Sequence, residues 1–442
     1  MKKAAKNSGA QRRKAMNTPA CLLRYADQLE AYYRRYYPAL APLAKPCFLS
    51  TVQTTMERLP DGAAFVITGD IPAMWLRDSS AQVKNYLPFA AEDETVRDLL
   101  RGVIATQVKD VLLDAYANAF NREANGLCYK VDKTERNPAV WERKYEVDSL
   151  CAPILLAESY EKAAGDTAIY TADFHRMLRR IAEVFRLEQR HERSAYSFER
   201  EDCPEQDTLP CNGRGTPVGY TGMTWSGFRP SDDRCEYGYL IPANMMAVMA
   251  MRAAARMARE KFGDEALAAE CAALEKEMEA GIRQFGVVEI EGKQVYCYEA
   301  DGLGHYKFMD DANSPSLLSA PYLGFCPADD PLYLRTRSLI LSEKNPYYAA
   351  GACARGVGSP HTPEGYVWHI GITMQALTST SREEILDCLA ELAGTHAGCN
   401  LMHESFDPND PARFTRADFA WANTLLASLM IHLMDERFFE QA

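Results

Sequence analysis

The chain has 442 residues, 47% of them hydrophobic and 25% charged, which is typical of a globular protein. Its formal net charge of −12 argues against a nucleic acid or an anionic membrane as partner, because either would require a basic face. No apolar run approaches the roughly 18 residues of a bilayer-spanning helix.

The stretch Met1–Met16 is basic but lacks the apolar core of a secretory signal. We expect a disordered extension over residues 1–17, with an RNA-binding arm as the alternative. The 13 cysteines have no regular spacing and no Cys-x-x-Cys pair, which predicts reduced thiols and a cytoplasmic location. A loop closed by Cys203 and Cys211 is the less favoured interpretation.

Helical periodicity dominates the chain, with apolar residues recurring every three or four positions. Asp264 is a candidate N-cap and Gly286 a candidate stop for one helix, and Ser381 with Glu384 forms a capping-box motif. About a dozen helices are expected. The main ones cover Cys21–Tyr33, a stretch near Leu100–Ala115, Val147–Ala164, Thr167–Arg190, Tyr239–Phe262, Leu267–Ile282, Pro331–Ser342, Gly365–Ser379, Ser381–Thr395 and Trp421–Leu433.

Strand signals are few. They cover Ala64–Thr68 and a hairpin formed by Val287–Ile290 and Val295–Tyr298 around a Glu-Gly turn. No linker rich in Ser, Gly or Pro divides the chain. The sequence therefore predicts one all-α domain over residues 18–442, with a few short strands in loops.

The long connections are unusually rich in aromatic and charged residues, and they contain all five tryptophans of the protein. Aromatic faces beside planar hydrogen-bonding groups are typical of a carbohydrate pocket. The alternative for any single tryptophan is a plug that packs a loop onto the core. The tryptophans are Trp75, Trp141, Trp225, Trp368 and Trp421.

The first of these connections places Asp70, Arg77 and Asp78 beside Trp75 in an otherwise apolar stretch. Buried charges persist only when they are paired or hydrogen-bonded. The three charges therefore form an internal ion network or hold a polar ligand, and the two interpretations are compatible.

Two further connections supply candidate acid–base groups. Asp232 and Asp233 precede a helix and follow Trp225, so that burial or the neighbouring charge would keep one carboxyl protonated as a general acid. Adjacent aspartates are also common in turns, where they bond to the backbone. Glu404 lies near aromatic residues and is a candidate general base, although a surface loop is the commoner position for a glutamate.

A metal site is the rival interpretation for the histidines and acids. His361, His369 and His403, and the pair Asp310-Asp311 after His305, do not have the spacing of known metal ligands. The Gly-x-Ser-x-Gly nucleophile motif and the Gly-Lys-Ser/Thr ending of a phosphate loop are also absent. We therefore expect no metal and no cofactor.

At these segments the sequence resembles glycoside hydrolase family 125, the metal-independent exo-α-1,6-mannosidases. The similarity runs from about residue 20 to the C-terminus. The segments that carry it are TGDIPAMWLRDSSAQV from Thr68, WERKYEVDSLCAPI from Trp141, GFRPSDD from Gly227, YGYLIPANMMAV from Tyr237, FMDDANSPSLLS from Phe308, VWHIGITMQALTS from Val367, and MHESF with FAWAN after it.

The resemblance implies an (α/α)6 toroid, inversion of anomeric configuration, no metal and an α-mannoside oligosaccharide as substrate. It also implies an acid from GFRPSDD, with Asp232 preferred over Asp233, and Glu404 as the base that activates water. Such a pair requires carboxyls about 6.5–9.5 Å apart. The residues expected to bind the sugar are Asp70, Trp75, Arg77, Asp78, Trp225, Arg229, His305, Asn313, His369 and Arg416.

Three alternatives stay open from the sequence. A glucoamylase- or trehalase-like enzyme would share the fold but accept α-glucosides. A polysaccharide lyase would act on anionic sugars, which an acidic pocket disfavours. A non-catalytic sugar-binding protein would keep the tryptophans without needing the Asp232–Glu404 pair. A monomer or weak oligomer is expected.

Overall fold

The computed structural model describes residues 17–440, so the prediction of a disordered extension over residues 1–17 lies outside the described residues except for Asn17. The described part contains thirteen α-helical segments. They are α1 (Ala20–Tyr36), α2 (Ala41–Ser50), α3 (Leu76–Val83), α4 (Glu94–Leu113), α5 (Val147–Ala164), α6 (Ala172–Glu188), α7 (Pro210–Gly213), α8 (Ile241–Phe262), α9 (Glu265–Phe285), α10 (Pro331–Ile340), α11 (His369–Leu377), α12 (Arg382–Gly394) and α13 (Ala420–Asp435).

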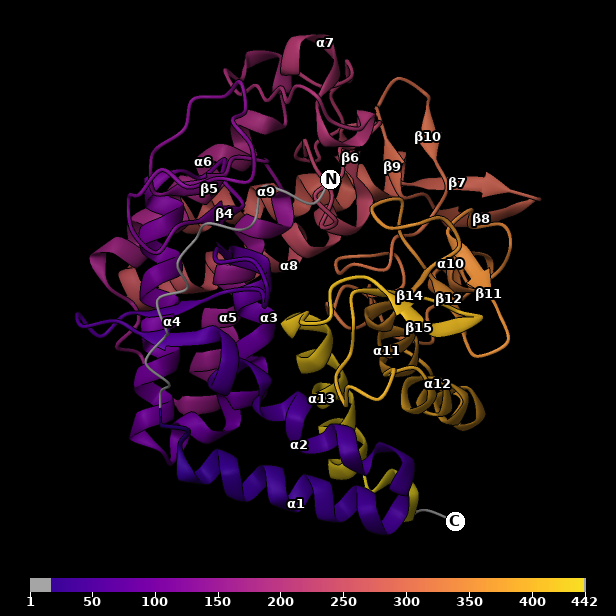
Figure 1. Cartoon of the computed structure of the whole chain (residues 1–442). Coiled ribbons are helices and arrows are strands. Elements are labelled where there is room, and N and C mark those ends of the chain that lie inside the picture. Colours follow the sequence, from indigo (N-terminus) through magenta and orange to yellow (C-terminus); the bar gives the residue numbers. More distant parts are fainter. Residues whose placement is uncertain (1–16, 441–442) are drawn as a thin grey trace.

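The helices form the predicted (α/α)6 toroid. Helix α3 packs against α5, α5 against α8, α11 against α13, and α13 against α3, which makes an inner ring. Outer helices cover it in pairs such as α8 with α9 and α11 with α12. In Figure 1, α3, α8, α11 and α13 surround the middle of the molecule, whereas α1, α4 and α12 lie at its periphery.

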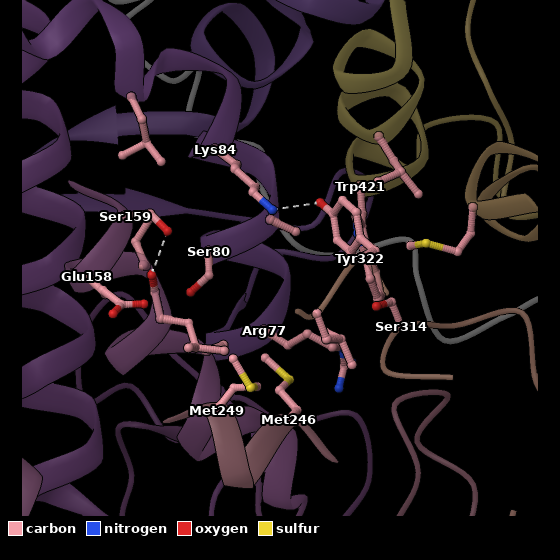
Figure 2. Close-up of a pocket in the computed structure, with 18 residues that line it drawn as sticks. Arg77, Ser80, Lys84, Glu158, Ser159, Met246, Met249, Ser314, Tyr322 and Trp421 are labelled. Atoms are coloured by element: carbon pink, nitrogen blue, oxygen red, sulfur yellow. Dashed lines mark hydrogen bonds between the residues drawn. The ribbon is translucent and has the colours of Figure 1, made fainter. Parts of the chain in front are cut away.

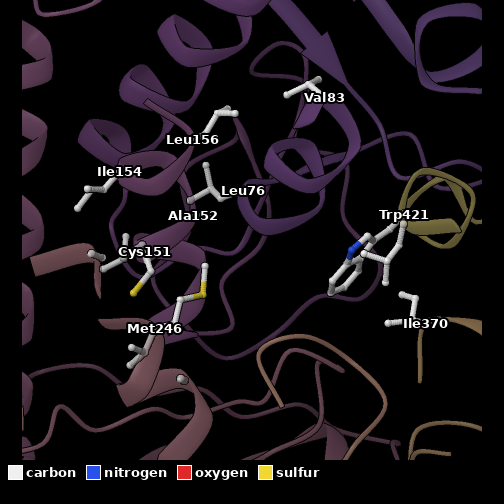
Figure 3. Close-up of a cluster of buried hydrophobic side chains, with 14 of the residues drawn as sticks. Leu76, Val83, Cys151, Ala152, Ile154, Leu156, Met246, Ile370 and Trp421 are labelled. Carbon is white, nitrogen blue, oxygen red and sulfur yellow. The ribbon is translucent and has the colours of Figure 1, made fainter. Parts of the chain in front are cut away.

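The inner helices are buried on most of their surface. Val147–Ile154 of α5 is buried throughout, as an inner helix covered from both sides requires. Figure 3 shows part of this core, where Leu76 of α3 and Leu156 of α5 lie near Met246 of α8. Trp421 of α13 enters the same region from the other side of the ring.

The bore of the toroid holds a cavity of about 230 Å³, which residues of α3, α5, α8, α11 and α13 line. Figure 2 shows Arg77 and Trp421 reaching into it. At the cavity wall, Lys84 Nζ donates a hydrogen bond of 3.0 Å to the Tyr322 hydroxyl and lies 4.1 Å from the centre of that ring.

Short strands precede three of the inner helices. Strand β3 (Met74–Trp75) leads into α3, β6 (Tyr239–Leu240) into α8 and β13 (Val367–Trp368) into α11. Each belongs to a three-stranded antiparallel sheet, β3-β4-β5, β10-β9-β6 or β13-β14-β15. The partner strands are β4 (Ala119–Phe120), β5 (Val140–Glu142), β9 (Glu299–Ala300), β10 (Tyr306–Lys307), β14 (Ser405–Asp407) and β15 (Asp410–Phe414). These sheets fix the loops at the N-terminal ends of the inner helices.

The remaining strands form three two-stranded pairs. They are β1 (Met56–Arg58) with β2 (Ala64–Val66), β7 (Val287–Ile290) with β8 (Lys293–Tyr296), and β11 (Tyr348–Ala350) with β12 (Arg355–Val357). The β7–β8 hairpin was predicted, and its turn residues Glu291 and Gly292 have φ of 53° and 74°.

Several predicted helix ends are confirmed. Helix α5 has the predicted bounds, and the Asp264 side chain accepts a hydrogen bond from Leu267 N. The Ser381 side chain likewise accepts from Glu384 N. The prediction was wrong at residues 365–368, where β13 replaces the start of the expected helix because Val367 and Trp368 pair with β14. All 13 cysteines are free, including Cys203 and Cys211.

Candidate active site

A small cavity of about 40 Å³ lies where the N-terminal ends of the inner helices converge. Its lining includes the two predicted acid–base groups, Asp232 and Glu404. The other residues that line it are Thr68, Ile71, Trp75, Arg77, Asp78, Pro230, Ser231, Asn313, His361, Trp368, Arg416, Phe419 and Trp421. Two carboxyls distant in sequence thus share one pit with four large aromatic side chains.

Asp232 is held firmly on its loop. Its φ of 67° is a left-handed conformation that non-glycine residues seldom adopt, and such strain is common at functional sites. The buried Lys144 donates a hydrogen bond of 2.6 Å to the Asp232 carbonyl oxygen. Asn118 Nδ2 donates to Asp232 Oδ1 at 3.1 Å. The carboxyl is therefore oriented from both its backbone and its side chain.

Arg77 organises a buried group of carboxyls beside Asp232. Its Nη1 donates to Glu146 at 2.8 Å and to Asp148 at 2.9 Å, and its Nη2 lies 3.3 Å from Asp78. Its guanidinium carbon lies 5.5 Å from the centre of the Trp421 ring. Arg77 and Asp78 therefore form the internal ion network and also line the cavity, so that both interpretations from the sequence are compatible with their positions.

Burial and neighbouring charges shift the pKa values of this group in opposite directions. Burial raises the pKa of Glu146 well above its usual range, with Arg77 opposing that rise. Burial would also raise the pKa of Asp232, but Lys144 and a hydrogen bond from Glu146 hold it below its ordinary value.

Asp233 lies behind the cavity and does not line it. Its carboxyl is buried and bonds to His361 Nδ1 at 3.0 Å. His361 reaches the cavity, and its side chain is 33% exposed. Although burial opposes it, the contact with Asp233 raises the pKa of His361 to about 9. Asp233 therefore keeps a cation at the cavity wall near neutral pH.

Glu404 stands in simpler surroundings on the hairpin side of the site. Thr415, which follows β15, donates its hydroxyl to Glu404 Oε2 at 2.9 Å. Arg416 Nη1 lies 3.5 Å from Glu404 Oε1, and its Nη2 bonds to Asp70 at 2.6 Å. Asp70 is half-exposed and holds Arg416 from outside the pit.

Besides Asp70 and Asp233, four residues expected at the site lie outside the lining of the pit. Trp225 is buried, and its ring stacks on His191 with centroids 3.5 Å apart. Gly238 allows this packing, since a Cβ there would lie 2.0 Å from Trp225 Nε1. Arg229 is buried against Glu299 at 2.6 Å. These two side chains stabilise the core behind the loop that carries Asp232.

The other two displaced residues are histidines. His305 is 69% exposed on its side chain and pairs with Asp301 outside the cavity lining. His369 is buried, bonding to the His403 backbone and to Thr395, and burial lowers its pKa to about 3. His369 is therefore a neutral residue of the core.

Sequence reasoning missed several residues around Asp232. Lys144 and Glu146 lie in a segment quoted for the family resemblance, where alternating charges beside apolar residues were an available signal. His361 was considered only as a metal ligand. Asn118 had no distinguishing signal, because it follows a short turn and reaches the site through β4.

Within residues 17–440, no group of three or more His, Cys, Asp and Glu side chains is placed to hold a metal ion. None of the helices in that range is both long and apolar enough to cross a membrane. The chemistry available at the pit is that of carboxyls, the cations of Arg77, Arg416 and His361, hydroxyls and aromatic faces.

An aspartate and a glutamate that share an aromatic-lined pit on an (α/α)6 toroid define a glycoside hydrolase. The model of the metal-independent α-mannosidases, glycoside hydrolase family 125, matches residues 37–431. The chain belongs to this family and is an α-mannosidase, as its segments predicted.

Individual relatives agree with this assignment. The Meiotically up-regulated gene 157 protein of Schizosaccharomyces pombe is 38% identical over 425 residues, which cover 90% of this chain and 83% of that protein. A metal-independent α-mannosidase of Streptococcus pneumoniae, solved as a non-productive complex with α-1,6-mannobiose, is 40% identical with a TM-score of 0.92. That alignment covers 95% of this chain and all of the other.

More distant structures share the fold alone. A bacterial glucoamylase complexed with acarbose is 14% identical with a TM-score of 0.59, over 92% of this chain and 58% of that one. The glucoamylase of Saccharomycopsis fibuligera is also 14% identical, with a TM-score of 0.54 over 97% and 98% of the two chains. The toroid is therefore shared with enzymes that act on other sugars.

Proposed function

We propose that the enzyme hydrolyses terminal α-1,6-linked mannose with inversion, using Asp232 as general acid and Glu404 as general base. The observation that carries this proposal is the shared cavity: two carboxyls from different loops line one aromatic pit. The α-1,6 linkage is supported by the mannobiose bound to the Streptococcus pneumoniae relative.

The mechanism is a single displacement. Asp232 donates a proton to the leaving glycosidic oxygen, and Glu404 accepts a proton from the water that attacks the opposite face of the anomeric carbon. Thr415 and Arg416 orient Glu404 through the contacts at 2.9 and 3.5 Å. Asp233 is an unsuitable acid, because it is buried outside the lining and bonded to the cationic His361.

The pit is small, which suits an enzyme that binds one terminal sugar ring rather than the middle of a chain. Trp75, Trp368 and Trp421 offer aromatic faces, and Arg77, Asp78 and Asn313 offer polar groups to the hydroxyls. We further propose that the enzyme is cytoplasmic and acts as a monomer or weak oligomer.

The test is incubation with α-1,6-mannobiose, with and without a chelator. We expect released mannose at equal rates in both arms. A glucose disaccharide panel distinguishes a glucoamylase- or trehalase-like specificity, and binding without hydrolysis would identify a sugar-binding protein. Loss of activity on chelation would contradict the metal-independent mechanism.

A further inference from the structure

The surroundings of Asp232 contain more buried acids than buried bases. Around the single guanidinium of Arg77 lie the carboxyls of Asp78, Glu146 and Asp148, and Asp232 adjoins them. Lys144 adds one further cation. Four adjacent carboxylates with two cations leave an excess of buried negative charge, which is costly unless a proton is retained.

The proton has a defined place in this group. The Glu146 and Asp232 carboxyls are hydrogen-bonded to each other, which requires a proton between them because two carboxylates are only acceptors. Asn118 Nδ2 supports both partners, at 3.4 Å from Glu146 Oε1 and 3.1 Å from Asp232 Oδ1.

The other oxygen of Glu146 is fixed independently. Glu146 Oε2 accepts hydrogen bonds of 2.8 Å from Arg77 Nη1 and from Ser149 Oγ. Glu146 immediately precedes α5, so its position is set by the start of an inner helix. One oxygen is therefore held by the buried cation and the other is left to face Asp232.

We propose that Glu146 is a positioning residue that holds the one proton it shares with Asp232 and supplies it to this general acid during turnover. This proposal rests on the proposed function of Asp232. Glu146 itself does not touch the sugar, because it is buried and absent from the lining of the pit.

The proton balance of a turnover is as follows. The shared proton moves onto Asp232 as Glu146 becomes ionised, and Asp232 passes it to the leaving oxygen while the glycosidic bond breaks. Water adds to the anomeric carbon and gives one proton to Glu404. Glu404 returns that proton to solvent, and the Glu146–Asp232 pair takes one from solvent, so that net hydrolysis consumes only water.

The charges around the pair explain why it holds one proton rather than two or none. Burial of both carboxyls and the charge of Asp148 favour protonation, whereas Arg77, Lys144 and the His361 imidazolium favour the ionised forms. The Glu142 carboxyl lies close to the pair as well, because its Oε2 accepts a hydrogen bond of 3.3 Å from Asn118 Nδ2. The pair titrates as a unit, with its second proton loss displaced to high pH.

The first experiment measures kcat/KM against pH for Glu146→Gln. An amide cannot share its proton with Asp232, so the basic limb of the profile should move down by about one pH unit or more. Activity on the acid side should stay within a few-fold of the parent protein. Asp148→Asn is the matched control, because Asp148 binds the same Arg77 nitrogen but does not bond to Asp232, and its limb should move far less.

A structural role alone gives a different result. If Glu146 only anchors Arg77, both variants lower kcat/KM equally at every pH and leave the limb in place, and the proposal is overturned. Glu146→Asp, which keeps a carboxyl, should return the limb toward its original position.

The second experiment does not depend on turnover. Infrared difference spectra of the full chain near neutral pH, parent minus variant, should show the loss of one protonated carboxyl band in Glu146→Gln and none in Asp148→Asn, because other buried acids such as Asp310 contribute equally to all the spectra. An unchanged band in Glu146→Gln overturns the shared proton even if the enzyme is active. A band that behaves as expected in a protein that releases no mannose upholds the pair and contradicts only the proposed function.

Discussion

The two sides of the pit differ in how they treat a carboxyl. Asp232 lies in a crowded buried group, with Lys144 on its backbone and the carboxyl of Glu146 on its side chain. Glu404 instead meets a hydroxyl and a guanidinium, with no acidic neighbour bonded to it. The proposed roles follow this contrast: Asp232 has a carboxyl partner that can share a proton with it, whereas Glu404 has only a hydroxyl and a guanidinium that orient it.

The largest expected effect comes from the base side. Glu404→Gln removes the proposed general base, and kcat should fall by about 10³ with any mannoside. The leaving group should make no difference, because water activation is required in each case. Steady-state kinetics measure this, and a variant with parent activity would place the base elsewhere.

Asp232→Asn should lower hydrolysis by an amount that depends on the leaving group, unlike Glu404→Gln. Hydrolysis of α-1,6-mannobiose should fall by roughly 10², since the leaving oxygen is no longer protonated. An aryl mannoside built on a strongly acidic phenol has a leaving group that departs as a phenolate without being protonated. The hydrolysis of that substrate should therefore fall much less. Equal losses on both substrates would show that Asp232 does not act as the acid.

Asp233→Asn tests the buried carboxylate that pairs with His361 outside the lining of the pit. Without this carboxylate the pKa of His361 should fall from about 9 toward its ordinary value of 6.5, so that most of the imidazole becomes neutral at pH 7 and activity should drop by a few-fold there. Because the folded pKa lies above the ordinary value of 6.5, the contact stabilises the fold fully below 6.5 and is lost as pH rises through about 9.

Two measurements check this third prediction. The His361 imidazole titration, followed by NMR, should move to lower pH in the variant, and the alkaline midpoint of unfolding should move with it. A parent-like titration would mean that other groups hold the imidazolium.

His305→Ala should have the smallest effect. Its side chain is exposed and pairs with Asp301 away from the pit, and such pairs contribute about 0–1 kcal/mol to folding. We expect parent kcat/KM and nearly unchanged urea unfolding. A large rise in KM would mean that the substrate extends to the β9–β10 hairpin.

Much of the fold could be predicted from local signals. The bounds of α5 and the Asp264 cap follow from apolar spacing and from side chains that bond to nearby backbone. The strands that precede α3, α8 and α11 could not, because pairs of two or three residues have no periodicity of their own. Their pairing depends on partners far along the chain.

The residues of the site were also only partly predictable from the sequence. The segments that hold Asp232 and Glu404 were recognisable from their residues, but Arg77 and Arg229 have the same chemistry in similar settings. One lines the pit and the other pairs with Glu299 in the core. Trp75 likewise lines the pit whereas Trp225 stacks on His191 in the core, because the position of each tryptophan depends on how its loop folds.

The most direct test of the central claim is the configuration of the mannose first released from an α-mannoside, followed by proton NMR before mutarotation. Water activated by Glu404 while Asp232 protonates the leaving group must give β-mannose. Initial release of α-mannose would require a covalent intermediate and would contradict the assignment of both carboxyls.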